Sequence, residues 1–315
     1  MNFQQLRFVR EAVRNGLNLT TTSSALFTSQ SGVSRQIKDL EDELGVEIFV
    51  RKGKRLVGLT KVGEGVLPFV EKILLEAENL RRYSGQFTKQ LDGRLVIAAT
   101  HNQARYVLPD VIQCFIAEFP NVHLELRQGT PHYVAQSIIK GDSDLGIATE
   151  ALDTFPELIT YNCFSWRHMA IVSTDHPLTA KSVVSLADLA QYPIITYNRN
   201  FTGRSLIDAT FARAGLTPDI RLTAMDADVI KTYVELGLGI GIVAELAFDP
   251  QRDKTLVALV ATKGLFEPNT TKVAIRRGAL LQSYAYRLIE LFAPRYSKLE
   301  LMDTVFAAHE VAVTI

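Results

Sequence analysis

The sequence predicts an α/β protein with three parts: a small basic helical head, one long connecting helix and a two-lobed α/β body. Three observations support this division. Residues 1–62 hold ten Lys and Arg against six Asp and Glu, although the whole chain of 315 residues has 34 of each. Residues 63–89 carry one apolar stripe, and the rest alternates between strand and helix patterns. We therefore place domain boundaries at residues 1–62, 63–92 and 93–315.

Three helix patterns open the head. The first covers residues 3–14, and a second, short helix follows the capping residue Asn18 and ends near Leu26. A third helix starts near Ser31, after a tight turn. Its apolar positions recur every three or four residues and are Val33, Ile37, Leu40 and Leu44. This succession predicts a helix-turn-helix, whose last helix is the one that enters a DNA groove.

Hydroxyl, amide and cationic side chains gather on the opposite side of the turn and the third helix. They are Thr28, Ser29, Gln30, Ser31, Ser34, Arg35 and Lys38. Groups of these kinds hydrogen-bond base edges and phosphates, so they predict a DNA-binding surface. Glu41, Asp42 and Glu43 follow too late in the helix and are expected to face away from DNA.

A hairpin wing is predicted directly after this helix. Two short apolar runs flank a basic tip that holds Arg51, Lys52, Lys54 and Arg55. These cations can reach phosphates beside the groove. The alternative is a solvated charge run, which is favoured for such a segment alone but not for one that follows a helix-turn-helix pattern.

The long helix over residues 63–89 exposes more apolar surface than a small head can cover. Its stripe comprises Val66, Phe69, Val70, Ile73, Leu74, Ala77 and Leu80. Such a stripe usually packs against a partner helix, so a second copy of the chain is the expected partner. Packing within one chain is the alternative. Pro68 lies in the first turns and marks a bend.

The body reads as two linked α/β lobes. In the first, strands and helices alternate at 94–100, 104–118, 122–126, 132–140 and 144–149. In the second, strands at 168–174, 193–198, 220–224 and 239–244 alternate with helices at 203–214 and 227–236. The chain then returns through strands at 255–260 and 271–277 to a final helix at 280–293. We assign residues 93–162 and 268–315 to lobe I and residues 163–267 to lobe II, each a parallel sheet covered by helices.

Polar residues end the predicted strands in both lobes. Thr100, Asn102 and Gln103 follow the first strand, Thr149 follows the third, and Thr202 begins a helix of lobe II. Hydroxyl, amide and backbone N–H groups form an anion site without Lys or Arg, and ligands of such sheets lie between the lobes. The alternative for each residue is a helix cap. Trp166, the one tryptophan, either walls this cleft or packs in the core.

Other classes of protein receive little support from the sequence. No GxSxG, HExxH or Walker motif points to an enzyme, and Asp226 and Asp228 are expected to cap a helix rather than form a catalytic pair. Two distant cysteines and six scattered histidines predict neither metal nor cofactor. No long apolar run or signal peptide is visible, so a cytoplasmic protein without a membrane segment is expected. A solute-binding protein for a small oxyanion is the alternative, but it would have no use for the basic head.

Two motifs place the chain in a known family. Residues 25–49, from Ala25-Leu26-Phe27-Thr28-Ser29-Gln30 to Ile48-Phe49, resemble the N-terminal domain of LysR-type transcriptional regulators. In the body, Thr100-His101-Asn102-Gln103 and Phe201-Thr202-Gly203-Arg204 resemble the CysB/Cbl branch, which governs sulfur assimilation. The resemblance implies a periplasmic-binding-protein-like effector domain.

The resemblance also implies partners and an effector. It implies a homo-oligomer, dimeric through the long helix and tetrameric in full, that acts on promoter DNA and RNA polymerase as an activator. The effector would be sulfate, adenosine phosphosulfate or an acetylserine-like compound. Residues matching the family's effector site are Thr100, Asn102, Gln103, Thr149 and Thr202, with Trp166 beside them. Asn102 replaces the usual threonine, which leaves the identity of the effector open.

Overall fold

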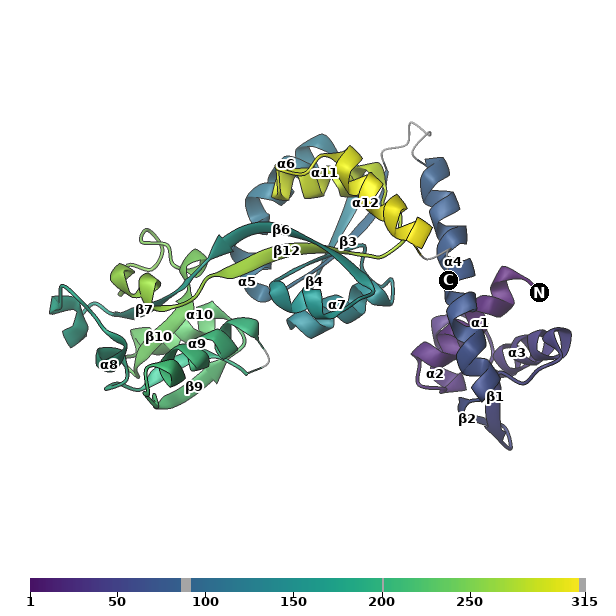
Figure 1. The fold of residues 1–315 in the computed structure, drawn as a ribbon, viewed down its shortest axis with the longest axis horizontal. Coiled ribbons are helices and arrows are strands. Elements are labelled where there is room, and N and C mark those ends of the chain that lie inside the picture. Colours follow the sequence, from purple (N-terminus) through teal and green to yellow (C-terminus); the bar gives the residue numbers. More distant parts are fainter. Residues whose placement is uncertain (86–91, 200, 312–315) are drawn as a thin grey trace. The chain divides into compact units, whose positions relative to one another are not determined.

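The computed structural model describes residues 1–85, 92–199 and 201–311, without the side chains of Thr202 and of residues 305–311. The chain divides into two compact units, residues 1–88 and 89–315. Figure 1 shows the elements of each unit. The long helix α4 therefore belongs to the first unit, together with the head. Within the described ranges, no helix is both long enough and apolar enough to cross a membrane.

The first unit is a winged helix-turn-helix followed by a long helix. Its elements are α1 (Phe3–Arg14), α2 (Leu19–Ala25), α3 (Gln30–Leu44), β1 (Phe49–Lys52), β2 (Arg55–Leu59) and α4 (Lys61–Gly85). The core contains Val33, Ile37 and Leu40 of α3, as expected. Leu44 is 41% exposed, so the prediction that it continues the buried stripe is wrong. It is the last residue of α3, where Gly45 turns the chain away with a φ of +67°.

Helix α4 begins against the wing. The Thr60 hydroxyl accepts a hydrogen bond from the backbone N–H of Gly63, and a Cβ at Gly63 would lie 2.0 Å from the carbonyl oxygen of Ile48. Only glycine permits this approach. Val70 and Leu74, further along α4, join the core of the head. The first half of the long helix is therefore part of the helix-turn-helix unit.

Lobe I of the second unit is a five-stranded sheet in the order β4-β3-β5-β12-β6. Its strands are β3 (Gly93–Ala99), β4 (Val122–Gln128), β5 (Leu145–Ala148), β6 (Leu158–Trp166) and β12 (Asn269–Arg276). Its helices are α5 (His101–Tyr106), α6 (Leu108–Glu118), α7 (Pro131–Ile139), α11 (Ser283–Phe292) and α12 (Lys298–Val311). Ile97 and Ala99 point into one core and Ala98 into another, so apolar side chains cover both faces of the sheet.

Lobe II is a second five-stranded sheet, in the order β11-β7-β10-β8-β9. Its strands are β7 (His168–Ser173), β8 (Ile194–Tyr197), β9 (Ile220–Ala224), β10 (Ile240–Ala244) and β11 (Leu256–Leu259). Its helices are α8 (Leu186–Leu189), α9 (Thr202–Arg213) and α10 (Ala227–Glu235). The chain enters this lobe between Trp166 and His168 and leaves it before Asn269, and the antiparallel pair β6 and β12 bounds both crossings (Figure 1).

Several expectations for the body need correction. The predicted parallel sheets are mixed, because β12 and β6 in lobe I and β7 and β11 in lobe II run antiparallel to their neighbours. Strand β6 and helix α12 were not predicted. The helix expected over 104–118 is two helices, because Pro109 lies at the start of α6 and cannot continue α5.

Candidate functional site

Most of the side chains predicted to meet DNA lie exposed on the turn and on α3. Thr28, Gln30, Ser31 and Lys38 are exposed, Ser34 is half-buried, and the side chain of Arg35 is 83% exposed beside Asp39 at 3.9 Å. Ser29 caps α3, because its hydroxyl accepts a hydrogen bond from the N–H of Gly32. This arrangement presents donors and cations along the first turns of one helix, as base and phosphate readout requires.

The wing separates its four predicted cations into two groups. Lys52, Lys54 and Arg55 are exposed around the turn at Gly53, whose φ is +63°. Arg51 instead pairs with Glu41 of α3 at 2.8 Å. Glu41 is buried and also accepts hydrogen bonds from the backbone N–H groups of Ile48 and Phe49. Arg51 and Glu41 therefore fasten the wing to α3, a role that the sequence pattern did not indicate.

Phe27 is an exposed residue beside the predicted DNA-binding surface, and it was not among the residues predicted from the sequence. It lies in the turn between α2 and α3, is 99% exposed and has a φ of +50°. A large apolar side chain at such a position is uncommon. Its only sequence signal is its place immediately before Thr28, within the turn that the helix-turn-helix pattern defines.

The apolar stripe of α4 is divided between two environments. Val70 and Leu74 are buried in the core of the head, whereas Phe69 is 70% exposed and Leu80 is 68% exposed. Ile73 lies between these extremes at 37%. A face of α4 therefore remains uncovered by the residues that the structure describes.

A cavity lies between the two lobes of the second unit, where the predicted effector residues meet. It is lined by Thr100, His101, Asn102, Gln103, Pro131, Thr149, Trp166, His168, Tyr197, Phe201, Gly203 and Met225. Five of the six predicted residues are among them, and the side chain of the sixth, Thr202, lies outside the described part. Among the described lining residues, none is Lys or Arg. Its volume is about 30 Å³ for water-sized spheres, which is room for about two water molecules.

Hydrogen bonds fix the polar side chains that line the cavity. The Gln103 amide and the Trp166 indole both donate to the hydroxyl of Thr271, at 2.9 and 3.0 Å. The Asn102 amide donates a hydrogen bond to the Tyr197 hydroxyl at 3.1 Å. The same hydroxyl also accepts a hydrogen bond from the backbone N–H of Ala244. Trp166 is therefore both a wall of the cavity and a buried residue, 4% exposed.

His168 is a further lining residue that the sequence reasoning missed. It is fully buried, and its ring contacts those of Trp166 and Tyr197 edge to face. Burial lowers its pKa to about 3, although the carboxylate of Glu245 opposes this shift. The imidazole is therefore neutral near pH 7. Nothing in the sequence distinguishes it from the chain's other histidines, because Tyr197, Phe266 and Asn269, which surround its ring, are distant from it in the sequence.

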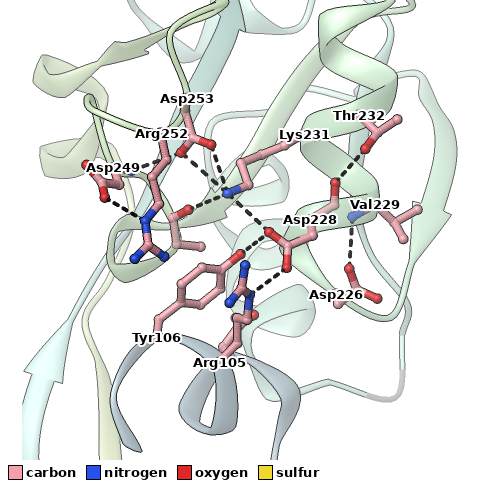
Figure 2. A network of polar contacts seen from close by, with 12 residues as sticks. Arg105, Tyr106, Asp226, Asp228, Val229, Lys231, Thr232, Asp249, Arg252 and Asp253 are labelled. Atoms are coloured by element: carbon pink, nitrogen blue, oxygen red, sulfur yellow. Dashed lines mark hydrogen bonds and ion pairs between the residues drawn. The ribbon is translucent and has the colours of Figure 1, made fainter. Parts of the chain in front are cut away.

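A network of polar contacts joins the lobes beside the cavity, and Figure 2 shows it from close by. The Tyr106 hydroxyl of α5 donates to Asp228 of α10 at 2.7 Å, and Arg105 donates to the same carboxylate at 3.2 Å. Lys231 lies 3.2 Å from Asp228 and is anchored by Asp253 at 3.1 Å. Burial alone would raise the pKa of Asp228, but these three donors lower it. We call these contacts of Asp228 with Tyr106 and Arg105 the interlobe clasp.

The two aspartates that were both expected to cap a helix have different roles in the structure. Asp226 caps α10 by accepting a hydrogen bond from the N–H of Val229. Asp228 instead belongs to the interlobe clasp. Together with His101 they place three potential metal ligands within 4.8 Å of one another. Since the cap and the clasp already use both carboxylates, this cluster has a structural explanation.

The family of the chain follows from two models that match it. Residues 3–64 match the bacterial regulatory helix-turn-helix protein of the lysR family, and residues 88–297 match the LysR substrate binding domain. These ranges cover the head and most of the second unit.

Individual proteins are similar over nearly the whole chain. The HTH-type transcriptional regulator SsuR of Burkholderia cenocepacia is 60% identical, over 96% of this chain and 97% of its own length. The regulator CysB of the same species is 53% identical over 95% of both chains. The crystal structure of the cofactor-binding domain of the Cbl transcriptional regulator is 47% identical, with a TM-score of 0.65, and covers 68% of this chain and 93% of that one.

Proposed function

The chain belongs to the LysR family of bacterial transcriptional regulators, and on that premise we propose that it activates sulfur or alkanesulfonate assimilation genes in response to a small sulfur-related anion. The observation that carries the effector proposal is the interlobe cavity, whose described lining offers hydroxyl, amide and imidazole groups but no cation. Uncharged donors suit the sulfate ion, the sulfate group of adenosine phosphosulfate or the carboxylate of acetylserine. The alternative of a solute-binding protein is disfavoured by the helix-turn-helix match.

We propose that the head reads promoter DNA as one of a pair. Gln30, Ser31 and Arg35 would enter the major groove while Lys52, Lys54 and Arg55 of the wing contact phosphates. The exposed Phe69, Ile73 and Leu80 of α4 would pack against a second copy, giving a dimer and, by pairing of dimers, a tetramer. As an activator in the cytoplasm, the bound assembly would contact RNA polymerase.

Helix α5 is the element through which an effector would act on the lobes. It carries Asn102 and Gln103 in the cavity and Arg105 and Tyr106 in the interlobe clasp, all within six residues. An effector that shifts α5 or separates the lobes would therefore change the clasp, and its binding would bias the relative position of the lobes.

Thermal shift of the full-length protein tests the effector proposal. Sulfate, adenosine phosphosulfate and acetylserine are added separately, and at least one is expected to raise the Tm. Thr100→Val should abolish that increase, because Thr100 lines the cavity and its side chain makes no capping hydrogen bond whose loss would harm the fold. Thr217→Val, an exposed position in lobe II, is the matched control. A full shift in Thr100→Val, or no shift with any compound, would refute the proposal.

A further inference from the structure

Buried side-chain polar atoms without a hydrogen-bond partner concentrate around the interlobe cavity. Six such atoms occur in the described residues, and five are at or next to the cavity. They are His101 Nε2, Asn102 Oδ1, Gln103 Oε1, His168 Nε2 and Asn269 Oδ1. Because buried polar groups are nearly always paired, such a cluster indicates where a ligand supplies the missing partners.

His168 and Asn269 form the most deeply buried part of this cluster. Both are fully buried, at the two points where the chain crosses between the lobes, and the Asn269 amide lies 3.2 Å from His168 Nδ1. If Asn269 donates through Nδ2, the imidazole proton is on Nε2, which leaves a free donor on His168 and a free acceptor on Asn269. If the amide is reversed, the two roles are exchanged. In either arrangement the pair offers one donor and one acceptor.

Both unpartnered atoms lie near Gly203, at the start of α9. A Cβ added to Gly203 would lie 2.6 Å from His168 Nε2 and 3.7 Å from Asn269 Oδ1, so a side chain at this position would clash with the imidazole. Gly203 and His168 both line the cavity. The aromatic rings of Trp166, Tyr197 and Phe266 hold the imidazole in place. The pair is therefore rigid and uncharged, and its imidazole lines the cavity.

We propose that His168 and Asn269 form a second subsite of the cleft, which binds a hydroxyl or amino group of an organic effector whose oxyanion is bound by the other polar groups of the cavity. This inference rests on the proposed effector function and selects among its candidates. Inorganic sulfate has only acceptors near pH 7, so it cannot satisfy the acceptor of the pair. A small organic anion with its own hydroxyl or amino donor can satisfy this acceptor.

Matched ligands isolate the hydroxyl group. We compare 2-hydroxyethanesulfonate with ethanesulfonate, and 3-hydroxypropanesulfonate with propanesulfonate, together with inorganic sulfate. Binding to the full-length protein is followed by the fluorescence of Trp166, the one tryptophan, which lines the cavity. At least one hydroxylated ligand is expected to bind about tenfold more tightly than its partner, the effect of one additional buried hydrogen bond.

Substitutions of His168 assign the preference to the pair. His168→Phe keeps the ring contacts but removes both nitrogens, and it should eliminate the difference between the hydroxylated and unsubstituted ligands. His168→Gln retains a donor and an acceptor, so it should retain part of the preference for hydroxylated ligands. His123→Phe, at an exposed position on β4, is the matched control and should keep the full preference.

The outcomes separate the two proposals. If sulfate and the sulfonates all bind but hydroxylated and unsubstituted ligands bind equally, the subsite is wrong and the anion cleft stands. If His168→Phe keeps the tenfold preference, the hydroxyl is bound elsewhere and the subsite is again wrong. If none of the five compounds changes the fluorescence of Trp166, both the anion cleft and the subsite are overturned.

Discussion

The head and the body of this protein present opposite chemistry to their proposed anionic partners. On the head, Arg35, Lys38 and the wing cations are exposed and charged, whereas the polar groups of the cleft are largely buried and its described lining includes no Lys or Arg. Exposed cations bind phosphate through charge, which salt screens, whereas preorganised neutral donors bind by geometry. The comparison indicates that affinity for DNA and affinity for the effector are set by separate physical terms.

The largest effect is expected where the head uses a buried charge. Glu41→Ala removes the carboxylate that accepts from Ile48 and Phe49 and leaves Arg51 unpaired. We expect the head to lose about 3 kcal/mol of stability, because the buried backbone N–H groups of Ile48 and Phe49 lose their acceptor. Scanning calorimetry should show a lower unfolding temperature for the head and an unchanged unfolding temperature for the body. Glu47→Ala, which removes an exposed carboxylate, should leave both transitions in place, and equal curves for the two variants would contradict the role of Glu41.

Arg35→Ala tests the exposed charge of the head. If Arg35 contacts a base or a phosphate, its loss should weaken binding to a promoter fragment selected from genomic DNA by about tenfold or more, equivalent to about 1–3 kcal/mol. Fluorescence anisotropy measures this change. Arg213→Ala, which removes a cation exposed on lobe II, should bind as the wild type does. Unchanged binding by Arg35→Ala would remove this residue from the DNA surface.

The stability of the body at low pH tests whether His168 is buried in its neutral form. Because the pKa of His168 is about 3 in the folded protein and about 6.5 in the unfolded chain, the unfolded chain takes up the proton first as the pH falls. The stability of the body should therefore fall below pH 6.5, by about 2 kcal/mol at pH 5 from this residue alone. Urea unfolding followed by Trp166 fluorescence reports this unit. His168→Phe should lack this part of the pH dependence, and identical pH profiles would contradict a neutral, buried His168.

The interlobe clasp should give the smallest effect. Tyr106→Phe removes one hydrogen bond to Asp228, worth about 1 kcal/mol, while Arg105 still contacts the same carboxylate. We expect effector affinity to rise by about fivefold, because an effector that shifts α5 or separates the lobes then has one hydrogen bond less to break, while DNA affinity in the absence of effector is unchanged. Tyr133→Phe, at an exposed position of α7, is the control. Equal effector affinities in Tyr106→Phe and the wild type would show that the clasp does not report on the cleft.

Sequence reasoning reached most of the fold because the local patterns agree with it. Residues 3–14 form α1 as expected, since the apolar positions repeat at the helical period and Asn2 provides a capping box. The sequence did not predict strand β6 or the antiparallel direction of β12. Pairing between segments more than a hundred residues apart leaves no local pattern. Pro109 did offer a local signal for the break between α5 and α6.

The same distinction applies to the site. Thr100, Asn102, Gln103 and Thr149 follow predicted strands, so topology places them together. The Glu41–Arg51 pair, the clasp at Asp228 and the pairing of His168 with Asn269 depend on tertiary contacts between distant segments. Sequence patterns therefore indicated which residues line the cavity and the exposed side of α3, whereas the contacts that fix these surfaces came from the structure.

The dependence of both affinities on salt distinguishes a charged DNA surface from a neutral effector cleft. The full-length protein is titrated with the selected promoter fragment and, separately, with the tightest effector, between 50 and 200 mM salt. DNA affinity should fall by about a hundredfold or more over this range, because cations on paired heads displace counterions from phosphates. Effector affinity should change by less than about twofold, because the cleft binds through neutral groups. A steep decrease for the effector would contradict binding through neutral groups, and an unchanged DNA affinity would contradict binding through exposed cations.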